Sequence, residues 1–256
     1  MSLRHRTMSL RSLFILCSMM ASALLAGCAA QVTHQHAAPD DQKASSAYTQ
    51  LGLAYLRRDD LDRAQQALDH ALELSATDSE ALHGMALLYQ RQEEAALAER
   101  YYQRALAAAP DFTQARNNYA AFLYTHGRLE AACTQLQQAV EDLRYPKRAQ
   151  LYTNLGQCQL QTGKLQAAAQ SLSRAQGIEP RYARAYYVQA DVQHRLGNQA
   201  SAWEQLQQYF RLAGQDSESA RLARDIALSR GDARTAAYYS RQLTAPSAAS
   251  PDITDQ

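Results

Sequence analysis

The 256-residue chain has few of the residues that interrupt regular structure, and it carries almost no net charge. Six prolines and ten glycines are too few for a β-sandwich, which needs a turn about every 8–12 residues. A formal net charge of +1 excludes binding to nucleic acid or a membrane surface through bulk positive charge. Apolar residues make up 46% of the chain and aromatic residues 8%, too much for a disordered protein. The composition therefore predicts a helix-rich folded protein.

The amino terminus contains an apolar stretch that is too short to cross a membrane. It runs from Leu13 to Ala26, fourteen residues, and follows three arginines. A spanning helix needs about 20 residues, so this pattern is typical of a signal peptide. The stretch ends in Leu25-Ala26-Gly27-Cys28, which resembles the lipobox of bacterial lipoproteins. The alternative is an ordinary secretory signal followed by an unrelated cysteine.

The lipobox resemblance implies that residues 1–27 are removed and that Cys28 carries three acyl chains, which hold a protein stably on a bilayer. Because Ala29 rather than aspartate follows the cysteine, the resemblance implies an outer-membrane lipoprotein that faces the periplasm. Residues 28–44 are predicted to form the lipidated end and a flexible tether, and residues 244–256 a disordered tail. We interpret His34 and His36 as linker residues and expect no metal site.

A repeat organises the chain between the tether and the tail. Alanines recur at spacings of 34, 34, 36, 34 and 34 residues, at Ala64, Ala98, Ala132, Ala168, Ala202 and Ala236. A glycine precedes each of the last four by five residues, at Gly127, Gly163, Gly197 and Gly231. Asp59 and Glu93 fill the same place in the first two copies. A constant register of this kind indicates a repeat architecture.

The pattern resembles the tetratricopeptide repeat, in which W-x2-L-G-x2-Y precedes an alanine, a bulky apolar residue, a second alanine and a proline. The predicted copies span residues 45–78, 79–112, 113–146, 149–182, 183–216 and 217–243. Two inserted residues, Lys147 and Arg148, separate the third copy from the fourth, and the last two copies are weakly patterned. The resemblance implies an all-α, right-handed superhelix of about six repeats and twelve antiparallel helices.

No catalytic motif accompanies the repeats. The sequence lacks H-E-x-x-H, G-x-S-x-G and the glycine-rich phosphate-binding patterns. We therefore predict a protein that is not an enzyme and that takes no cofactor, nucleic acid or small-molecule substrate. An enzyme whose active site is completed by a partner is the remaining enzymatic alternative.

Two cysteines, Cys133 and Cys158, remain outside the signal peptide and the lipobox. The repeat register places them in the second helix of the third copy and the first helix of the fourth, which stack as neighbours. In an oxidising periplasm we predict a Cys133–Cys158 disulfide. The alternative is two buried thiols that face different neighbours.

The first helices of tetratricopeptide repeats line a groove that binds partners. Transferring the groove positions of the family to this chain gives a mixed surface. Its predicted partner-binding members are Leu53, Leu56, His83, Leu87, Asn117, Tyr124 and Leu160. These positions are not expected to pack the core of their own repeat, so they predict docking of a peptide or a helix. The alternatives are packing on a neighbouring repeat and burial under the tether. Asn117 and Asn118 disfavour a helix, which hints that one of them makes a hydrogen bond.

Several segments resemble the PilF/PilW lipoproteins of type IV pilus biogenesis. They are residues 51–56, 115–119, 121–124 and 154–158, with Cys133, Tyr145-Pro146 and Arg148. The resemblance implies a pilotin, which binds the secretin of the pilus and promotes its outer-membrane localisation and multimerisation, in support of pilus assembly and twitching motility. No role is transferred to the last two repeats. The alternative function is a general periplasmic adaptor lipoprotein for peptidoglycan hydrolases or outer-membrane protein assembly.

Overall fold

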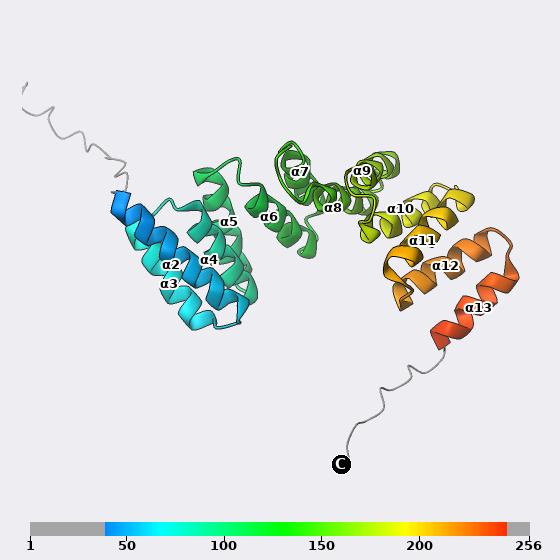
Figure 1. Ribbon diagram of the computed structural model, residues 1–256, viewed down its shortest axis with the longest axis horizontal. Helices are drawn as coiled ribbons and strands as arrows, with labels where there is room; N and C mark the ends of the chain where they lie inside the picture. Colours follow the sequence, from blue (N-terminus) through cyan, green and yellow to red (C-terminus); the bar gives the residue numbers. More distant parts are fainter. Residues whose placement is uncertain (1–38, 245–256) are drawn as a thin grey trace, which may run out of the picture. The chain divides into compact units, whose positions relative to one another are not determined.

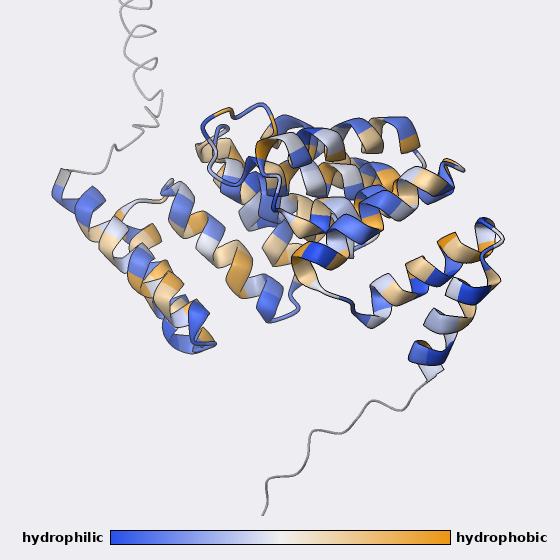
Figure 2. Cartoon of the chain, turned by 45° about the vertical axis from the view of Figure 1, so that its right-hand side comes forward, coloured by the Kyte–Doolittle hydropathy of each residue, from blue (hydrophilic) through white to orange (hydrophobic). Residues whose placement is uncertain are grey.

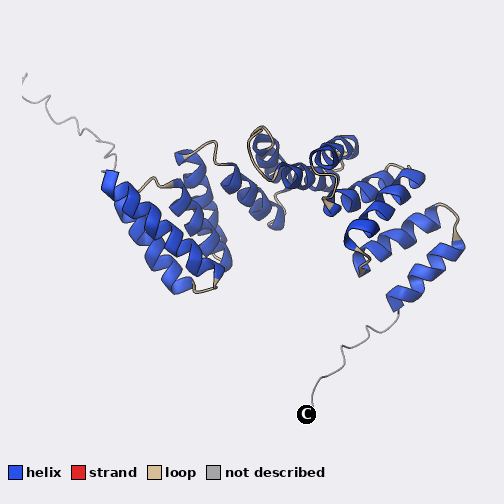
Figure 3. Cartoon of the chain, viewed as in Figure 1, coloured by secondary structure: helices blue, strands red, loops and turns tan. Residues whose placement is uncertain are grey.

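The computed structural model describes residues 39–244, and these residues form twelve helices. The helices are α2 (Pro39–Arg57), α3 (Leu61–Leu74), α4 (Ser79–Arg91), α5 (Ala95–Ala108), α6 (Thr113–Thr125), α7 (Leu129–Ala139), α8 (Arg148–Gln161), α9 (Leu165–Ile178), α10 (Ala183–Arg195), α11 (Gln199–Ala213), α12 (Ser217–Ser229) and α13 (Ala233–Thr244). Figure 3 shows only helices and loops in this part of the chain, with no strand. The predicted all-α class is confirmed. The predicted signal peptide, Cys28 and nearly all of the tail lie outside the described residues.

The helices associate in six consecutive pairs (Figure 1). The most extensive contacts join α2 with α3, α4 with α5, α6 with α7, α8 with α9, α10 with α11 and α12 with α13. Each pair also contacts the pair that follows it in sequence. One amphipathic pair cannot bury its own apolar face, so neighbouring pairs cover each other, as in other repeat proteins. The pairs coincide with the six predicted repeats.

Helix α2 begins earlier than predicted. The tether was expected to extend to residue 44, but α2 is a 19-residue helix that starts at Pro39. Proline is favoured at the first helical position, and Asp40 and Asp41 in the first turn interact favourably with the helix dipole. The buried hydroxyl of Ser45 donates to the carbonyl oxygen of Ala71 at 3.0 Å, which fixes this helix on α3. The repeat pattern begins only at residue 45, so it could not show this extension.

The small and bulky positions of the repeat form the core. The recurring alanines are buried in all six pairs, and the bulky residue four positions later is buried in the first five, for example Leu68 and Leu172. Small residues on the facing helix make room for these side chains. A Cβ atom added to Gly52 would lie 2.6 Å from Cγ of Leu68, and one added to Gly156 would lie 2.6 Å from Cγ of Leu172. The glycine of the L-G dipeptide is therefore required for close helix packing.

The turns within the pairs need a left-handed backbone conformation. Gly127, Gly163, Gly197 and Gly231 have φ angles between 72° and 82°. Asp59 and Glu93 adopt the same conformation, with φ angles of 59° and 61°. Glycine carries no Cβ penalty here, whereas a side-chain-bearing residue is strained. The equivalent positions predicted from the sequence thus have equivalent backbone geometry.

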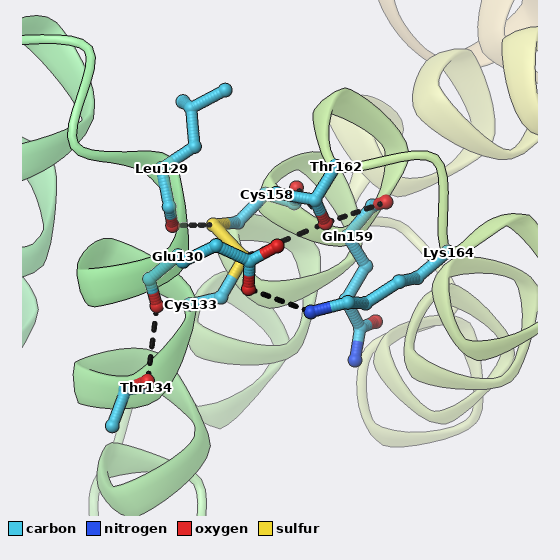
Figure 4. Close-up of polar contacts among 8 residues, drawn as sticks. All are labelled: Leu129, Glu130, Cys133, Thr134, Cys158, Gln159, Thr162 and Lys164. Atoms are coloured by element: carbon cyan, nitrogen blue, oxygen red, sulfur yellow. Dashed lines mark hydrogen bonds and ion pairs between the residues drawn. A yellow bond between two sulfur atoms is a disulfide. The ribbon is translucent and has the colours of Figure 1, made fainter.

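A disulfide joins the third pair to the fourth, the two repeats that the two-residue insertion separates (Figure 4). Cys133 of α7 and Cys158 of α8 are bonded, with their Cα atoms 5.6 Å apart. Beside them, Nζ of Lys164 lies 2.7 Å from a carboxylate oxygen of Glu130. One covalent bond and one ion pair therefore hold together the two repeats that the insertion separates.

Polar and apolar residues alternate around the helices (Figure 2). Each helix presents its apolar side to neighbouring helices and its polar side to solvent, as expected for an amphipathic repeat. Among residues 39–244, no helix combines the length and the hydropathy that a membrane span requires.

Candidate partner-binding groove

Two hollows lie along the first helices of the first four repeats. The first, the α2–α4 pocket, has a volume of about 440 Å³. It is lined by Gln50, Leu53, Leu56, Arg57, Glu80, His83, Leu87, Arg91, Phe112 and Gln114. The second, the α6–α8 pocket, has a volume of about 200 Å³. It is lined by Asn117, Ala120, Ala121, Tyr124, Thr125, Leu136, Asn154 and Gln157.

The α2–α4 pocket combines an apolar floor with a charged rim. Leu53 and Leu87 are half-buried, and both pack on the core between the first two repeats. Arg91 donates to the carbonyl oxygen of Leu56 and lies 3.0 Å from a carboxylate oxygen of Asp59. On the opposite side, Nε2 of Gln50 donates to the Glu80 carboxylate at 3.2 Å. Such a pocket suits an apolar side chain whose flanking groups are polar.

His83 is the buried polar residue of this pocket. Its side chain is only 3% exposed, and its ring meets Phe112 edge to face with centroids 5.2 Å apart. Burial lowers the pKa of His83 to about 4, because a charged imidazole loses its hydration there. The side-chain amide of Asn118 donates to Nε2 of His83 at 2.9 Å. The neutral ring therefore carries its proton on Nδ1.

Asn117 and Asn118 form a polar bridge between three first helices. Asn118 reaches back from α6 to His83 on α4, as described above. Asn117 points the other way, and its Oδ1 accepts a hydrogen bond from Nδ2 of Asn154 on α8 at 2.9 Å. The sequence hinted at one hydrogen bond from this pair, whereas both side chains make one. Helix α6 is thereby fixed between its two neighbours.

The α6–α8 pocket is smaller and has a more hydrophobic lining. Tyr124 is half-buried and forms one side, with Leu136 of the same repeat below it. The exposed Ala121 leaves space for an incoming side chain. The Asn117–Asn154 hydrogen bond lies at the edge and leaves polar groups available for orienting a ligand.

Six of the seven predicted groove residues border one of the two pockets. They are Leu53, Leu56, His83 and Leu87 at the α2–α4 pocket, and Asn117 and Tyr124 at the α6–α8 pocket. Leu160 borders neither pocket, so the prediction was wrong for this residue.

Leu160 is a core residue and not a groove residue, and Leu56 is mostly covered although it borders a pocket. Leu56 borders the α2–α4 pocket but is only 4% exposed and packs in the cluster that contains Leu68 and Met85. Leu160 is 2% exposed, borders neither pocket and packs with Leu172 and Val188. Both occupy the same place in the repeat, near the end of the first helix. There the side chain turns toward the following repeat and is covered by it.

Phe112 is a pocket residue that the groove positions missed. It immediately precedes α6, so it lies outside the first-helix positions used for the prediction. Its ring closes the α2–α4 pocket against His83. The sequence feature that could have indicated this role is a large aromatic residue in the connection between two repeats.

Comparison with known proteins identifies the family. The tetratricopeptide-repeat models match residues 45–78, 83–143 and 134–180. The type IV pilus assembly protein PilF of Pseudomonas aeruginosa is 31% identical over 201 residues, which cover 78% of this chain and 80% of that protein. This chain belongs to the PilF/PilW family of tetratricopeptide-repeat proteins.

Solved structures of the PilF/PilW family have the same fold. The structure of Pseudomonas aeruginosa PilF superposes with a TM-score of 0.71 and 30% identity, over 80% of this chain and 92% of that one. PilW, described as a widely conserved type IV pilus biogenesis factor, superposes with a TM-score of 0.70 and 25% identity, over 78% of this chain and 91% of that one. The predicted superhelix of tetratricopeptide repeats is confirmed.

Proposed function

We propose that this protein is a non-enzymatic lipoprotein of type IV pilus biogenesis that acts as a pilotin. In this proposal it binds the secretin subunit in the periplasm and promotes the localisation and multimerisation of the secretin in the outer membrane. The observation that carries the proposal is the pair of pockets along α2, α4, α6 and α8, in a chain of the PilF/PilW family.

The geometry supports capture of an extended or helical partner segment. Each pocket accepts an apolar side chain, and the polar bridge through Asn117 and Asn118 keeps α6 in a fixed position between the pockets. A segment with two apolar anchors would therefore meet a preformed site, which lowers the entropy lost on binding. Such binding requires no catalysis.

In this proposal the lipid anchor determines where the protein is located. Acylation of Cys28 holds the chain on the outer membrane, and the residues from 29 to 38 span at most about 35 Å when extended. The repeats then reach partners close to the inner surface of that membrane. Replacement of Cys28 by alanine should release the protein from the outer-membrane fraction. Retention of the variant in that fraction would contradict the anchor.

The test is an immunoblot of secretin multimers in separated inner and outer membranes, with and without the gene. We expect loss of heat-stable multimers, or their appearance in the inner membrane, when the gene is absent. Normal multimers in the outer membrane would refute the pilotin function and favour the general adaptor. The partner that co-purifies would then identify the peptidoglycan hydrolase or the assembly factor that this protein binds.

Matched variants connect this function to the groove. Arg57→Glu reverses a charge at the rim of the α2–α4 pocket, whereas Arg58→Glu reverses the adjacent exposed charge outside it. Leu87→Glu and Tyr124→Ala alter the apolar linings, and Leu228→Glu is the control, since Leu228 is 60% exposed in the last repeat. We expect the groove variants to lose secretin multimers and the controls to keep them. Normal binding by the groove variants, at normal protein levels, would place the partner elsewhere.

A further inference from the structure

The first repeat has a face that is buried in every later repeat. The seventh residue of the repeat is Leu51 in the first copy and is 43% exposed. Its counterparts are at most 6% exposed, and they are Met85, Tyr119, Leu155, Gln189 and Ala223. In those repeats the preceding helix pair covers this position. Within the described residues no helix pair precedes α2, so its stacking face is open.

This open face, which we call the end face, is a shallow hollow on α2 and α3. Its volume is about 670 Å³, and it is lined by Tyr48, Leu51, Tyr55, Arg63, Gln66, Ala67, Asp69, His70 and Glu73. The centre is apolar, with Tyr48 37% exposed beside Leu51. It shares no lining residue with the α2–α4 pocket.

The charges of the end face are separated along α3. Arg63 lies near the start of the helix with its side chain 66% exposed, and it forms a solvent-exposed ion pair with Asp60 at 3.4 Å. Glu73 lies near the end with its side chain 74% exposed and its carboxylate 3.0 Å from Nδ1 of His70, and Asp69 adds a second carboxylate one turn earlier. Ten residues of helix separate Arg63 from Glu73 by about 15 Å. The face therefore has a basic end, an apolar centre and an acidic end.

We infer that the end face binds a second copy of this chain across a two-fold axis. Rotation about an axis through the apolar centre places Arg63 of each copy opposite Glu73 of the other, so the weak exposed pairs of Arg63 with Asp60 and of Glu73 with His70 are exchanged for pairs between the copies. Leu51 lies close to that axis, since the adjacent Gly52 is level with Leu68, midway between the two charges. Both grooves remain open in such a dimer.

A head-to-tail arrangement fits less well. It would place α2 of one copy on the last repeat of another. The bulky core residue that covers the following pair is Leu68, Tyr102, Leu136, Leu172 and Leu206 in the first five repeats. In the last repeat this position is Ser240, so the residue that covers the following pair elsewhere is polar at this end, although Leu228 and Tyr238 of the last pair are exposed.

The footprint predicts a weak dimer. Over the roughly 20 Å that α2 and α3 share, two helices each about 10 Å wide cover about 400 Å² on each copy, or about 800 Å² in total, which is less than the roughly 1,200 Å² of a stable specific interface. Confinement of both copies to one membrane raises their effective concentration and favours association. The dimer rests on the lipid anchor of the proposed function but does not depend on secretin binding.

The test is thiol cross-linking of the full-length protein in its own membranes. Leu51→Cys lies beside its own counterpart in the inferred dimer, so a short bismaleimide should produce a covalent dimer on a denaturing gel. Leu228→Cys, at an exposed position of the last repeat, is the control for random collisions and should stay monomeric. Cys133 and Cys158 do not react, because they are bonded to each other.

Charge reversal distinguishes a two-fold dimer from other contacts. Either Arg63→Glu or Glu73→Arg, added to Leu51→Cys, should abolish the cross-link. In each variant, positions 63 and 73 of opposite copies carry the same charge, and the two-fold axis repeats this repulsion at two places. Combining both changes in one chain should restore it, as should co-expression of the two single variants. Absence of a Leu51→Cys dimer, or failure of the double change to restore it, would overturn the inference. Cross-linking of Leu51→Cys only to Tyr238→Cys would instead show a head-to-tail contact.

Discussion

The buried His83 makes the stability of this protein depend on pH in a predictable direction. Its pKa falls from 6.5 to about 4 on folding, because the imidazole is desolvated in the α2–α4 pocket. As the pH drops below 6.5, the unfolded chain binds a proton that the folded chain excludes. Stability is therefore complete above about pH 6.5 and is lost between that pH and 4.

The size of the effect follows from the two pKa values. Between pH 7 and pH 5, protonation of the unfolded state alone lowers the free energy of unfolding by about 2 kcal/mol. His83→Gln removes the titration and keeps an acceptor for the amide of Asn118. We expect wild type to lose about 2 kcal/mol more than His83→Gln over this range. All other titrating groups are common to both proteins, so their contributions cancel in the comparison.

Two measurements check this prediction. Urea unfolding at pH 7 and at pH 5 gives the free energies of wild type and His83→Gln. An NMR titration of the histidine rings should show one resonance with a midpoint near pH 4, and the variant should lack this resonance. The reasoning is refuted if both proteins lose the same free energy, or if the missing resonance titrates near pH 6.5.

Three further predictions concern packing, the disulfide and a turn, each read from urea unfolding. Gly156→Ala forces a methyl group against a buried side chain of α9 and should lower the free energy of unfolding by about 1–3 kcal/mol. Gly177→Ala, which meets open space in the same helix pair, should raise it by about 0.5–1 kcal/mol. Replacing both Cys133 and Cys158 by alanine should cost about 3 kcal/mol, since the bridge spans a separation of 25 residues; an unchanged midpoint would contradict this. Glu93→Gly should stabilise by about 1 kcal/mol by relieving its left-handed backbone, and Glu93→Ala should not.

The fold could be predicted from the sequence because every repeat packs its two helices with the same types of residue at the same positions. A single alanine predicts nothing, but six alanines in a constant register identify the close contact between two helices. The same register located the left-handed turns, including those at Asp59 and Glu93, where no glycine marks them. The start of α2 could not be found in this way, because residues 39–44 lie outside the repeat, and the helix begins there with Pro39, Asp40 and Asp41.

The groove was only partly predictable, because exposure in a solenoid depends on the next repeat. Leu53 and Leu56 are the same residue type on one helix, and the sequence treated them alike. Leu56 is covered because the following repeat places Met85 and its neighbours against it. The position in the repeat shows on which side of its helix a residue lies, but the neighbouring repeat decides whether that side is covered.

The junction between the third and fourth repeats shows how an irregular sequence keeps a regular groove. Two inserted residues lengthen the connection between α7 and α8. Besides the packing of these helices, three contacts hold the third repeat on the fourth: the Cys133–Cys158 bond, the Glu130–Lys164 ion pair and the Asn117–Asn154 hydrogen bond. The last of these also borders the α6–α8 pocket. A partner that fills both pockets needs them at a constant spacing, and the bonds across this junction help to maintain it.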